Sequence, residues 1–485
     1  MAINLGSMFA PTAAIWFKNS VLEADGFRIE QTADVQLKES MIPTVCNWCL
    51  DTDNFRSMPA TNTEKYESML NFAVNARMEA NRAEYKDMDK KEVEKTLKAE
   101  MSEGTALSTF FSDNLAAFAS HCKYKAADIK DFAAAYITSF SQGCGRAFML
   151  ACGSLVISFL IYFFGRPTYK HIITDKKNAD KKADKAAAVQ GPELSPAQTK
   201  QRIVALLLVF AVVIFFWMVF HQNGQTLTEF AKSCTADSTG SWTRIGFNLW
   251  ALVTIAVGVY ALFGVFQSKS VKAKSISGLV LLAAIGIVTW IYIDTPAVVE
   301  NIDPAVYQQF NPFYVVALTP FSMALFGWLA GKGKEPSAPR KIGYGMIVAG
   351  LAYLVMVFGS LQLTGTNGSE SPNWLISTYL LLTFAELLLS PMGISFVSKV
   401  APPKYKGSMM GGWFAATAIG NYLVSIPMLM WGKVSVPVIW GILIAICLLS
   451  AAFIFSIMKK LEAATSDDAA VEPAESIENV EDDAI

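Results

Sequence analysis

The sequence is poor in charged residues and in the side chains that carry most enzyme chemistry. Of its 485 residues, 17% are charged and 3 are histidine, whereas about a quarter of the residues in a soluble protein are charged. The net charge of −1 offers no basic surface for nucleic acid, and the 7 scattered cysteines form no disulfide framework. The sequence has no metal-ligand cluster, catalytic triad, phosphate loop or dinucleotide glycine pattern. It therefore predicts neither an enzyme nor a cofactor.

Hydrophobic residues make up 53% of the chain, and they are concentrated in long runs. A helix needs about 20 apolar residues to cross a bilayer, and long runs with almost no charge argue against the interior helices of a soluble enzyme. The predicted fold class is an all-α membrane protein, multi-pass in the cell membrane, with the lipid bilayer as its surroundings. The nine candidate runs are 147–165, 203–220, 246–267, 276–294, 312–330, 342–363, 375–397, 408–431 and 434–457.

Lys and Arg alternate between successive connections. They are frequent in 166–202, 268–275, 331–341 and 398–407 and absent from 295–311 and 364–374. Because basic short loops stay cytoplasmic, this pattern orients the spans. It divides the chain into a partial transmembrane helix 1–17, an external helical insert 18–146, a transmembrane helix 147–165, a basic cytoplasmic linker 166–202, a transmembrane bundle 203–458 and an acidic, disordered cytoplasmic tail 459–485.

The insert contains Cys46 and Cys49 at the spacing of a redox motif, with Cys122 further along. No βαβ pattern surrounds these cysteines, so a disulfide or a packing role is favoured over thiol chemistry.

One carboxylate interrupts the apolar run 375–397, at Glu386. An ionised group at the bilayer centre costs about 2.5–3.5 kcal/mol on insertion scales. We therefore expect Glu386 to face a cavity, where it can hold a cation or carry a proton, and the alternative is a structural pair with a neighbouring helix. Ser390 lies four residues on and shares its helix face, and Pro391 then weakens the helix.

Two further patterns lie in other spans. Trp413, Thr417 and Asn421 recur every four residues, which favours a cavity-lining face over an interfacial anchor for the tryptophan. His221 follows the run 203–220, and histidine titrates near neutral pH. It either shares a transported proton with Glu386 or is an interface histidine bonded to water. Asn311-Pro312 by itself marks only a helix start.

Several of these stretches together resemble the proton-coupled oligopeptide transporter (POT) family, a branch of the major facilitator superfamily. Glu386-Leu-Leu-Leu-Ser-Pro-Met-Gly393 resembles the tenth helix of the family, and Val400-Ala-Pro-Pro-Lys404 the connection after it. Residues 406–423 resemble the eleventh helix, and Asn311-Pro312 the opening of the eighth. Ile3-Asn-Leu-Gly-Ser-Met8 resembles the second half of the fifth-helix signature.

The resemblance implies a major-facilitator-type C-terminal six-helix bundle, two N-domain helices and an extra transmembrane hairpin at 246–294. It also implies symport, in which inward movement of protons drives the uptake of di- and tripeptides. Since Met1 falls within the fifth-helix signature, we expect four N-terminal helices to be missing from this chain or supplied by a separate N-terminal half.

The resemblance also implies roles for single residues. Glu386 and Asn311 would receive the peptide amino terminus, and Trp413 would line the pocket. We add Ser390 and Asn421 to the substrate-binding residues, and we expect Glu386 and His221 to couple protons. The family often has a glutamate in place of His221.

Two other functions stay open at this point. One is a non-transporting membrane protein, or a partial transporter, whose external insert is an interaction module. The other is a symporter of a different small organic solute.

Overall fold

The computed structural model describes residues 2–28, 35–37, 39–50, 63–81, 84–85, 90–103, 105–190, 195–363 and 368–465. The predicted disordered tail falls almost entirely outside these residues. Within them almost all of the regular secondary structure is helical, and the two named strands, β1 (Thr239–Gly240) and β2 (Val298–Val299), form one antiparallel pair of two residues each. The predicted fold class, an all-α membrane protein, is confirmed.

The insert and the helices that flank it come first in the chain. They are α1 (Ala2–Ala24), η1 (Glu39–Met41), α2 (Ile42–Leu50), α5 (Thr63–Ala80), α6 (Lys90–Ser102), α7 (Ala106–His121) and α8 (Ile129–Gln190).

The bundle and the hairpin beside it follow. Their elements are α9 (Pro196–Phe220), η2 (His221–Gly224), α10 (Thr226–Ser233), η3 (Ser241–Phe247), α11 (Leu249–Gln267), α12 (Val271–Asp294), η4 (Pro304–Gln309), α13 (Phe310–Gly331), α14 (Ala338–Ser360), α15 (Pro372–Val400), η5 (Pro403–Tyr405), α16 (Lys406–Leu423), α17 (Ser425–Leu429), α18 (Val436–Ser456) and α19 (Met458–Thr465).

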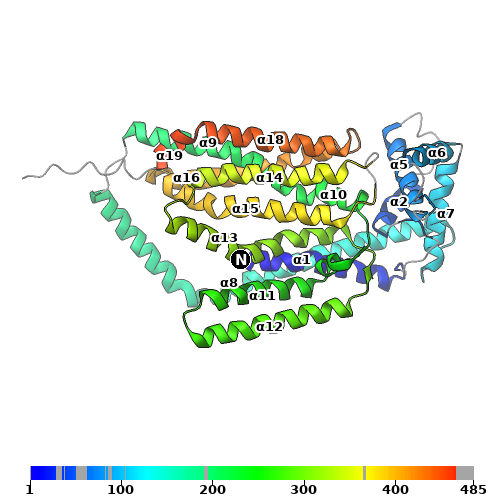
Figure 1. The fold of residues 1–485 in the computed structure, drawn as a ribbon, viewed down its shortest axis with the longest axis horizontal. Helices are drawn as coiled ribbons and strands as arrows, with labels where there is room; N and C mark the ends of the chain where they lie inside the picture. The colour runs from blue at the N-terminus through cyan, green and yellow to red at the C-terminus, as the bar shows by residue number, and fades with distance from the viewer. Residues whose placement is uncertain are drawn as a thin grey trace, which may run out of the picture.

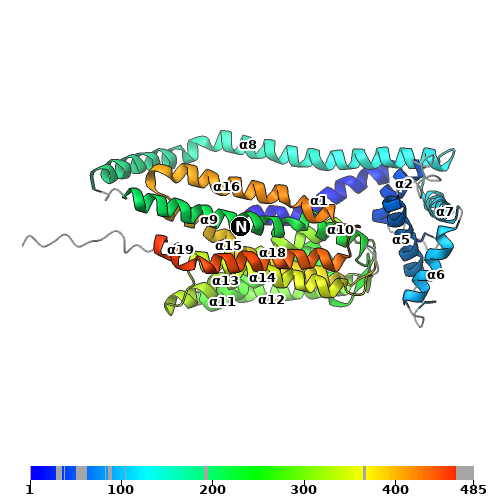
Figure 2. The ribbon, with the colours of Figure 1, turned by 90° about the horizontal axis from the view of Figure 1, so that it is seen from above.

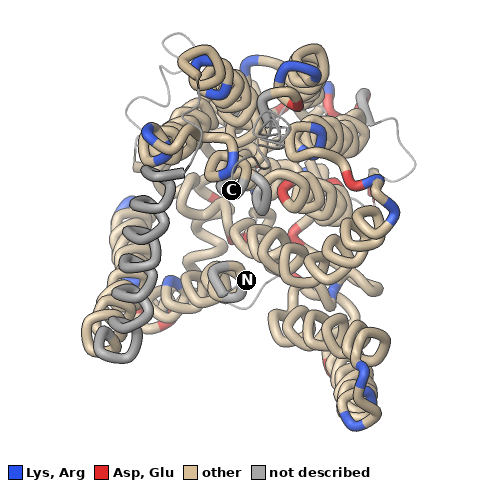
Figure 3. The backbone as a smooth tube through the Cα atoms, turned by 90° about the vertical axis from the view of Figure 1, so that its left-hand side faces the viewer, with Lys and Arg blue, Asp and Glu red and all other residues tan. Residues whose placement is uncertain are grey.

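The long helices run side by side, and the helices of the insert gather at one end of them (Figure 1). Seen from above, α8 runs along one edge of the molecule from the insert to the opposite end (Figure 2). The end view in Figure 3 shows α8 and the α11–α12 hairpin extending to either side of the bundle, with Lys and Arg mainly at helix ends and connections. Such a distribution suits helices whose apolar middles lie in lipid.

The largest core belongs to the bundle and is formed by α9, α14, α15, α16 and α18. Trp440 of α18 is fully buried and stacks on Tyr353 of α14, with the ring centroids 5.8 Å apart. The Tyr353 hydroxyl donates a hydrogen bond of 2.6 Å to the carbonyl of Val219, so a polar group inside this core is satisfied by α9. This packing fixes how α9, α14 and α18 lie relative to one another. Helix α14 also packs along α15, which carries Glu386.

The insert has a core of its own, made of aromatic and aliphatic side chains. Phe27 of the segment after α1 packs against Phe132 and Tyr136 of α8, while Trp48 of α2 packs against Phe111 of α7. Since α1 and α8 continue from this core into the apolar region, the insert is built directly onto two long helices. Cys46, Cys49 and Cys122 are free thiols buried in this core, which favours a packing role for them.

Eight helical segments of the described chain are long and apolar enough to cross a membrane, judged by length and composition. They overlap eight of the nine predicted runs. The exception is 408–431, where the helix stops at Leu423 and a short helix, α17, follows. Pro427 has no N–H to donate to the carbonyl of Leu423, which explains the break. The chain is thus a multi-pass membrane protein.

Two helix boundaries differ from those predicted. The first helix continues to Ala24, past the predicted end of the 1–17 segment. A single helix, α8, covers 129–190 and so includes the end of the predicted insert, the 147–165 span and much of the predicted linker. Residues 175–188 consist mainly of Ala, Lys and Asp, and the two commonest, Ala and Lys, are good helix formers. Hydropathy separates this basic stretch from the apolar span, but its helix propensity lets the helix of the span continue through it.

Candidate substrate and proton site

Glu386 lies within α15 and faces α13, where Asn311 occupies the first turn. The Asn311 amide, through Nδ2, donates a hydrogen bond of 3.0 Å to Glu386 Oε2. The same amide nitrogen donates a second bond of 3.0 Å to Thr383 Oγ1. The carboxylate is half-buried and points to a polar partner in the protein, as expected of an acid inside a membrane helix.

Thr383 holds this arrangement in place. Its hydroxyl donates a bond of 2.7 Å to the carbonyl of Tyr379 in its own helix, so its oxygen is left to accept from Asn311. Thr383 precedes Glu386 by three residues and therefore shares its helix face. Thr383 was not among the predicted site residues, although its spacing of three from Glu386 was a usable signal.

Asn311 is uncharged, and this decides what the carboxylate can do. An amide satisfies one acceptor position of Glu386 but does not neutralise an ionised carboxylate. In the described part of the chain, Glu386 has no ion pair with Lys, Arg or His. The group can therefore take up a proton or hold the ammonium group of a ligand, because either would cancel its charge.

Trp413 of α16 is 4% exposed and packs between two other helices. Its ring lies directly against Gly393 of α15, where an added Cβ would overlap the indole. Phe210 of α9 meets the same indole edge-on, with centroids 6.3 Å apart and an interplanar angle of 72°. The tryptophan is thus not an interfacial anchor, and its role in lining a pocket stays a prediction.

His221 begins η2, directly after α9, and pairs with Asn421 of α16. Its Nδ1 lies 2.5 Å from Asn421 Oδ1. Because an amide oxygen only accepts, Nδ1 carries the hydrogen in this pair. The imidazole also stacks on Trp217, at a centroid distance of 4.9 Å and an angle of 18°. This histidine is therefore bonded to a partner in the protein.

The polar side chains beside His221 fasten α9 to the end of α16. Gln222 is fully buried, and its Nε2 donates to the carbonyls of Met218, at 2.9 Å, and Val424, at 3.1 Å. Its Oε1 accepts a bond of 2.7 Å from the hydroxyl of Thr226.

The structure thus forms two polar pairs, Glu386 with Asn311 and His221 with Asn421. Among the described residues, no hydrogen bond or ion pair joins one pair to the other. A proton shared by His221 and Glu386 would have to travel through water or a rearranged side chain. Ser390 follows Glu386 by one turn of the α15 backbone, and its side chain lies outside the described residues.

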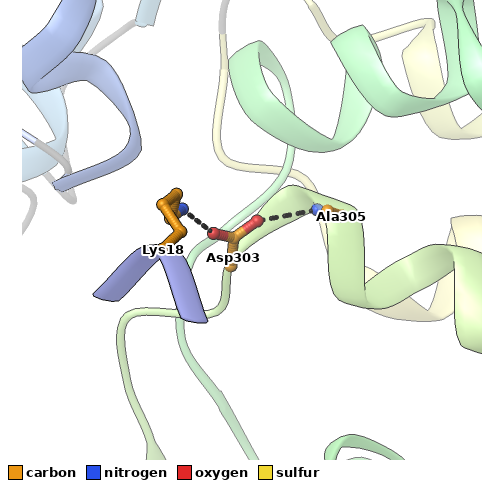
Figure 4. Close-up of polar contacts among 3 residues, drawn as sticks. All are labelled: Lys18, Asp303 and Ala305. Carbon is orange, nitrogen blue, oxygen red and sulfur yellow. Dashed lines mark hydrogen bonds and ion pairs between the residues drawn. The ribbon is translucent and has the colours of Figure 1, made fainter. Parts of the chain in front are cut away.

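A second set of contacts joins α1 to the segment that precedes α13 (Figure 4). Lys18 Nζ lies 2.7 Å from Asp303 Oδ2, and Asp303 Oδ1 accepts a bond of 2.9 Å from the N–H of Ala305. The hydroxyl of Thr12 donates a bond of 3.3 Å to Oε1 of Gln309, which lies two residues before Asn311. Lys18 and Asp303 are 285 residues apart, so no sequence pattern pointed to this pair.

Together the fold and this site describe a polytopic helical membrane protein with a carboxylate held between two membrane helices. Residues 292–439 match the model of the POT family, and this stretch contains Asn311, Glu386, Trp413 and Asn421. The expected resemblance to this family is confirmed over these residues. The matching family is one of transporters, not of enzymes.

Curated relatives agree with the family match. The uncharacterized transporter YclF of Bacillus subtilis (strain 168) is 40% identical over 114 residues, which cover 23% of this chain and 22% of that protein. The dipeptide and tripeptide permease A of Serratia proteamaculans (strain 568) is 26% identical over 240 residues, 47% of this chain and 43% of the permease. A di-/tripeptide transporter of Lactococcus lactis subsp. lactis (strain IL1403) is 24% identical over 291 residues, 56% of this chain and 52% of the transporter.

Among solved structures, a mutant of the peptide transporter POT in complex with alafosfalin aligns with a TM-score of 0.44 and 15% identity, over 95% of each chain. The chain spans about half the length, or less, of these curated relatives, which are covered by 22%, 43% and 52%.

Proposed function

We propose that this protein is a symporter that couples inward proton movement to the uptake of di- and tripeptides. The observation that carries the proposal is the Glu386 carboxylate inside α15, bonded at 3.0 Å by the uncharged amide of Asn311. The family match and the names of the curated relatives support the peptide as solute.

In this proposal Glu386 exchanges a proton for the ammonium group of the peptide. The ionised carboxylate attracts the peptide amino terminus, and protonation removes that attraction. For both to enter together, another group of the pathway, such as His221, would hold the proton while Glu386 holds the peptide. Asn311 keeps the carboxylate turned towards α13 in both states, because an amide can donate to either form.

The remaining predicted residues receive supporting roles. Trp413 would contact the peptide from α16, and Asn421 and Ser390 would offer it polar groups. His221 would take a proton from or give it to the same pathway, since histidine is the residue type whose ordinary pKa lies closest to neutral pH. The exchanged proton would be carried by Nε2, because Nδ1 already carries the hydrogen that is bonded to Asn421.

Uptake of labelled Ala-Ala into proteoliposomes that contain this chain tests the proposal. We expect uptake when the outside is made acidic, and its loss in the Glu386→Gln variant, which keeps the shape of the side chain and removes its charge. Glu300→Gln is the matched control, because Glu300 is exposed in the connection before η4. Gradient-driven uptake that survives Glu386→Gln would contradict the assigned role.

The same assay separates the two rival functions. Uptake by this chain alone excludes a purely non-transporting role. Competition by unlabelled amino acids that equals competition by unlabelled dipeptides would indicate a different organic solute.

A further inference from the structure

The insert and the bundle enclose a cavity at the end of the molecule where the insert lies. Its volume is about 350 Å³, within the range of small-molecule sites, roughly 300–1,000 Å³. The insert side contributes η1, α2 and the neighbouring parts of α1 and α8, while the bundle side contributes α10 and the segment before η4. No residue of the Glu386 site lines it.

Both signs of charge meet in this cavity. Its lining contains Lys18, Lys232, Glu39, Asp237 and Asp303. Lys18 and Asp303 satisfy each other at 2.7 Å, with side-chain exposures of 20% and 24% (Figure 4). The carbonyl of Asp237 accepts a bond of 2.8 Å from Ile302, which anchors that part of the wall.

Lys232 and Glu39 are less well satisfied. The Lys232 ammonium, half-buried on α10, lies 3.4 Å from Thr44 Oγ1, which is long for a hydrogen bond. In the described part of the chain, the Glu39 carboxyl makes no hydrogen bond and no ion pair. Burial raises the pKa of Glu39, while the positive charges of Arg28 and Lys18 oppose that shift.

We propose that this cavity binds a small zwitterion, an amino acid or a short peptide, with Lys232 on its carboxylate and Glu39 on its ammonium group. The inference rests on the proposed function, for which it supplies a first binding site on the insert side. Buried charges are stable only when they are paired, and one zwitterion pairs both of these groups at once.

The other lining residues fit this ligand class. Leu22, Pro43, Tyr136 and Phe140 give an apolar wall on which a ligand side chain can lie. A compact dianion such as phosphate would be repelled by the carboxyl groups of Glu39, Asp237 and Asp303. A simple cation would be repelled by the two lysines that line the cavity. A ligand that carries one charge of each sign avoids both conflicts.

Binding of Ala-Ala to the purified chain in nanodiscs tests this inference, measured by calorimetry in the Glu386→Gln background so that the Glu386 site is disabled. We expect Ala-Ala to bind this chain. Lys232→Gln or Glu39→Gln should then weaken binding at least tenfold. Lys95→Gln and Glu84→Gln are matched controls, because both residues are exposed on the insert, away from the cavity.

Two further measurements separate ligand contact from misfolding. Ser40→Trp keeps both charges but fills the cavity from η1, and it should also abolish binding. N-acetyl-Ala-Ala should bind more weakly to the chain with Glu39 but equally to the Glu39→Gln chain, since the acetyl group removes the ammonium charge.

The outcomes for this site and for the transport site are distinct. The cavity site would be overturned if Ala-Ala did not bind in the Glu386→Gln background. It would also be overturned if Lys232→Gln, Glu39→Gln and Ser40→Trp all left binding unchanged. Either result would leave the transport proposal intact. Uptake that survives Glu386→Gln would refute the transport site, whatever the cavity binds.

Discussion

Asn311 on α13 and Glu386 on α15 are 75 residues apart in the chain and are joined by a hydrogen bond of 3.0 Å from amide to carboxylate. The bond sets the direction of the acid and links the first turn of one helix to the middle of another. It makes Asn311 the most direct means of testing how the position of the carboxylate affects transport.

Replacing Asn311 by Ala should lower uptake about tenfold or more, since a hydrogen bond to a charged group contributes about 1.5–3 kcal/mol. Both Glu386 and Thr383 would lose their donor. The measurement is initial-rate uptake of Ala-Ala into proteoliposomes, corrected for the amount of protein inserted. Asn373→Ala is the control, since Asn373 is exposed at the start of α15. Equal rates for both variants would refute a role for the bond.

The contact between Gly393 and Trp413 predicts a steric effect. Gly393→Ala should lower the free energy of unfolding by about 1–3 kcal/mol, which is the usual cost of overpacking a core. The reason is that the added methyl group would overlap the indole of Trp413. Gly411→Ala is the control on α16, where nothing lies within 4 Å of the added Cβ. Thermal unfolding in detergent measures both, and a second substitution, Trp413→Leu, should restore part of the loss. A Gly393→Ala protein as stable as Gly411→Ala would show that the helices separate easily there.

The buried cysteines of the insert should be unreactive in the folded protein. Burial raises the pKa of Cys49 to about 11 and that of Cys122 to about 12, and it raises the pKa of Cys46 as well. At pH 8 a thiol of pKa about 11 is only ~0.1% thiolate, which is the reactive form. Mass spectrometry after a short maleimide treatment should find these three unlabelled in native protein and labelled after unfolding. Rapid labelling of the native chain would mean that the core of the insert opens.

The contact of Glu462 with the start of α14 should depend on pH. Glu462 accepts from the Ser337 hydroxyl at 2.7 Å and pairs with Arg340, whose Nε lies 2.7 Å from Oε1. The bond from Ser337 and the charge of Arg340 lower the pKa of Glu462 below 4.5. A carboxyl group with a lowered folded-state pKa stabilises the protein above its unfolded-state pKa, and this contribution is lost as the pH falls through the folded-state value.

Glu462→Gln should therefore lower the melting temperature slightly at pH 7 and by less at pH 3, which lies below the ordinary pKa of 4.5. The pair is partly exposed, with 31% of the Glu462 side chain accessible, so the effect should stay within about 1 kcal/mol. Differential scanning fluorimetry at the two pH values measures it. Glu300→Gln, which removes an exposed carboxylate, should show no such dependence, and an equal shift at both pH values would argue against the ion pair.

The sequence was enough to locate the membrane helices and the acid among them. Apolar runs predicted eight of the spans, because hydrophobic length is a local property. Glu386 stood out because a single carboxylate in a run such as 375–397 is costly in lipid. Spacing every four residues also singled out Trp413. Resemblance to the POT family then added Asn311, since Asn311-Pro312 by itself marks only a helix start.

Two other features were not predicted from the sequence. The break after Leu423 was missed because the apolar run continues through Pro427, and hydropathy does not register a missing N–H. Thr383 was missed because a threonine in an apolar helix usually bonds only its own backbone, and here it also accepts from Asn311.

The sequence by itself therefore determined that this chain is helical, lies in a membrane and buries one acid. Only the tertiary structure decided which group meets that acid, that His221 meets Asn421, and that Lys18 meets Asp303. The features determined by the sequence follow from how water or lipid solvates each segment taken alone. The contacts between residue pairs depend on the rotation and depth of helices that are far apart in the chain. That rotation and depth are set only when the helices pack, through contacts such as that of Trp413 with Gly393.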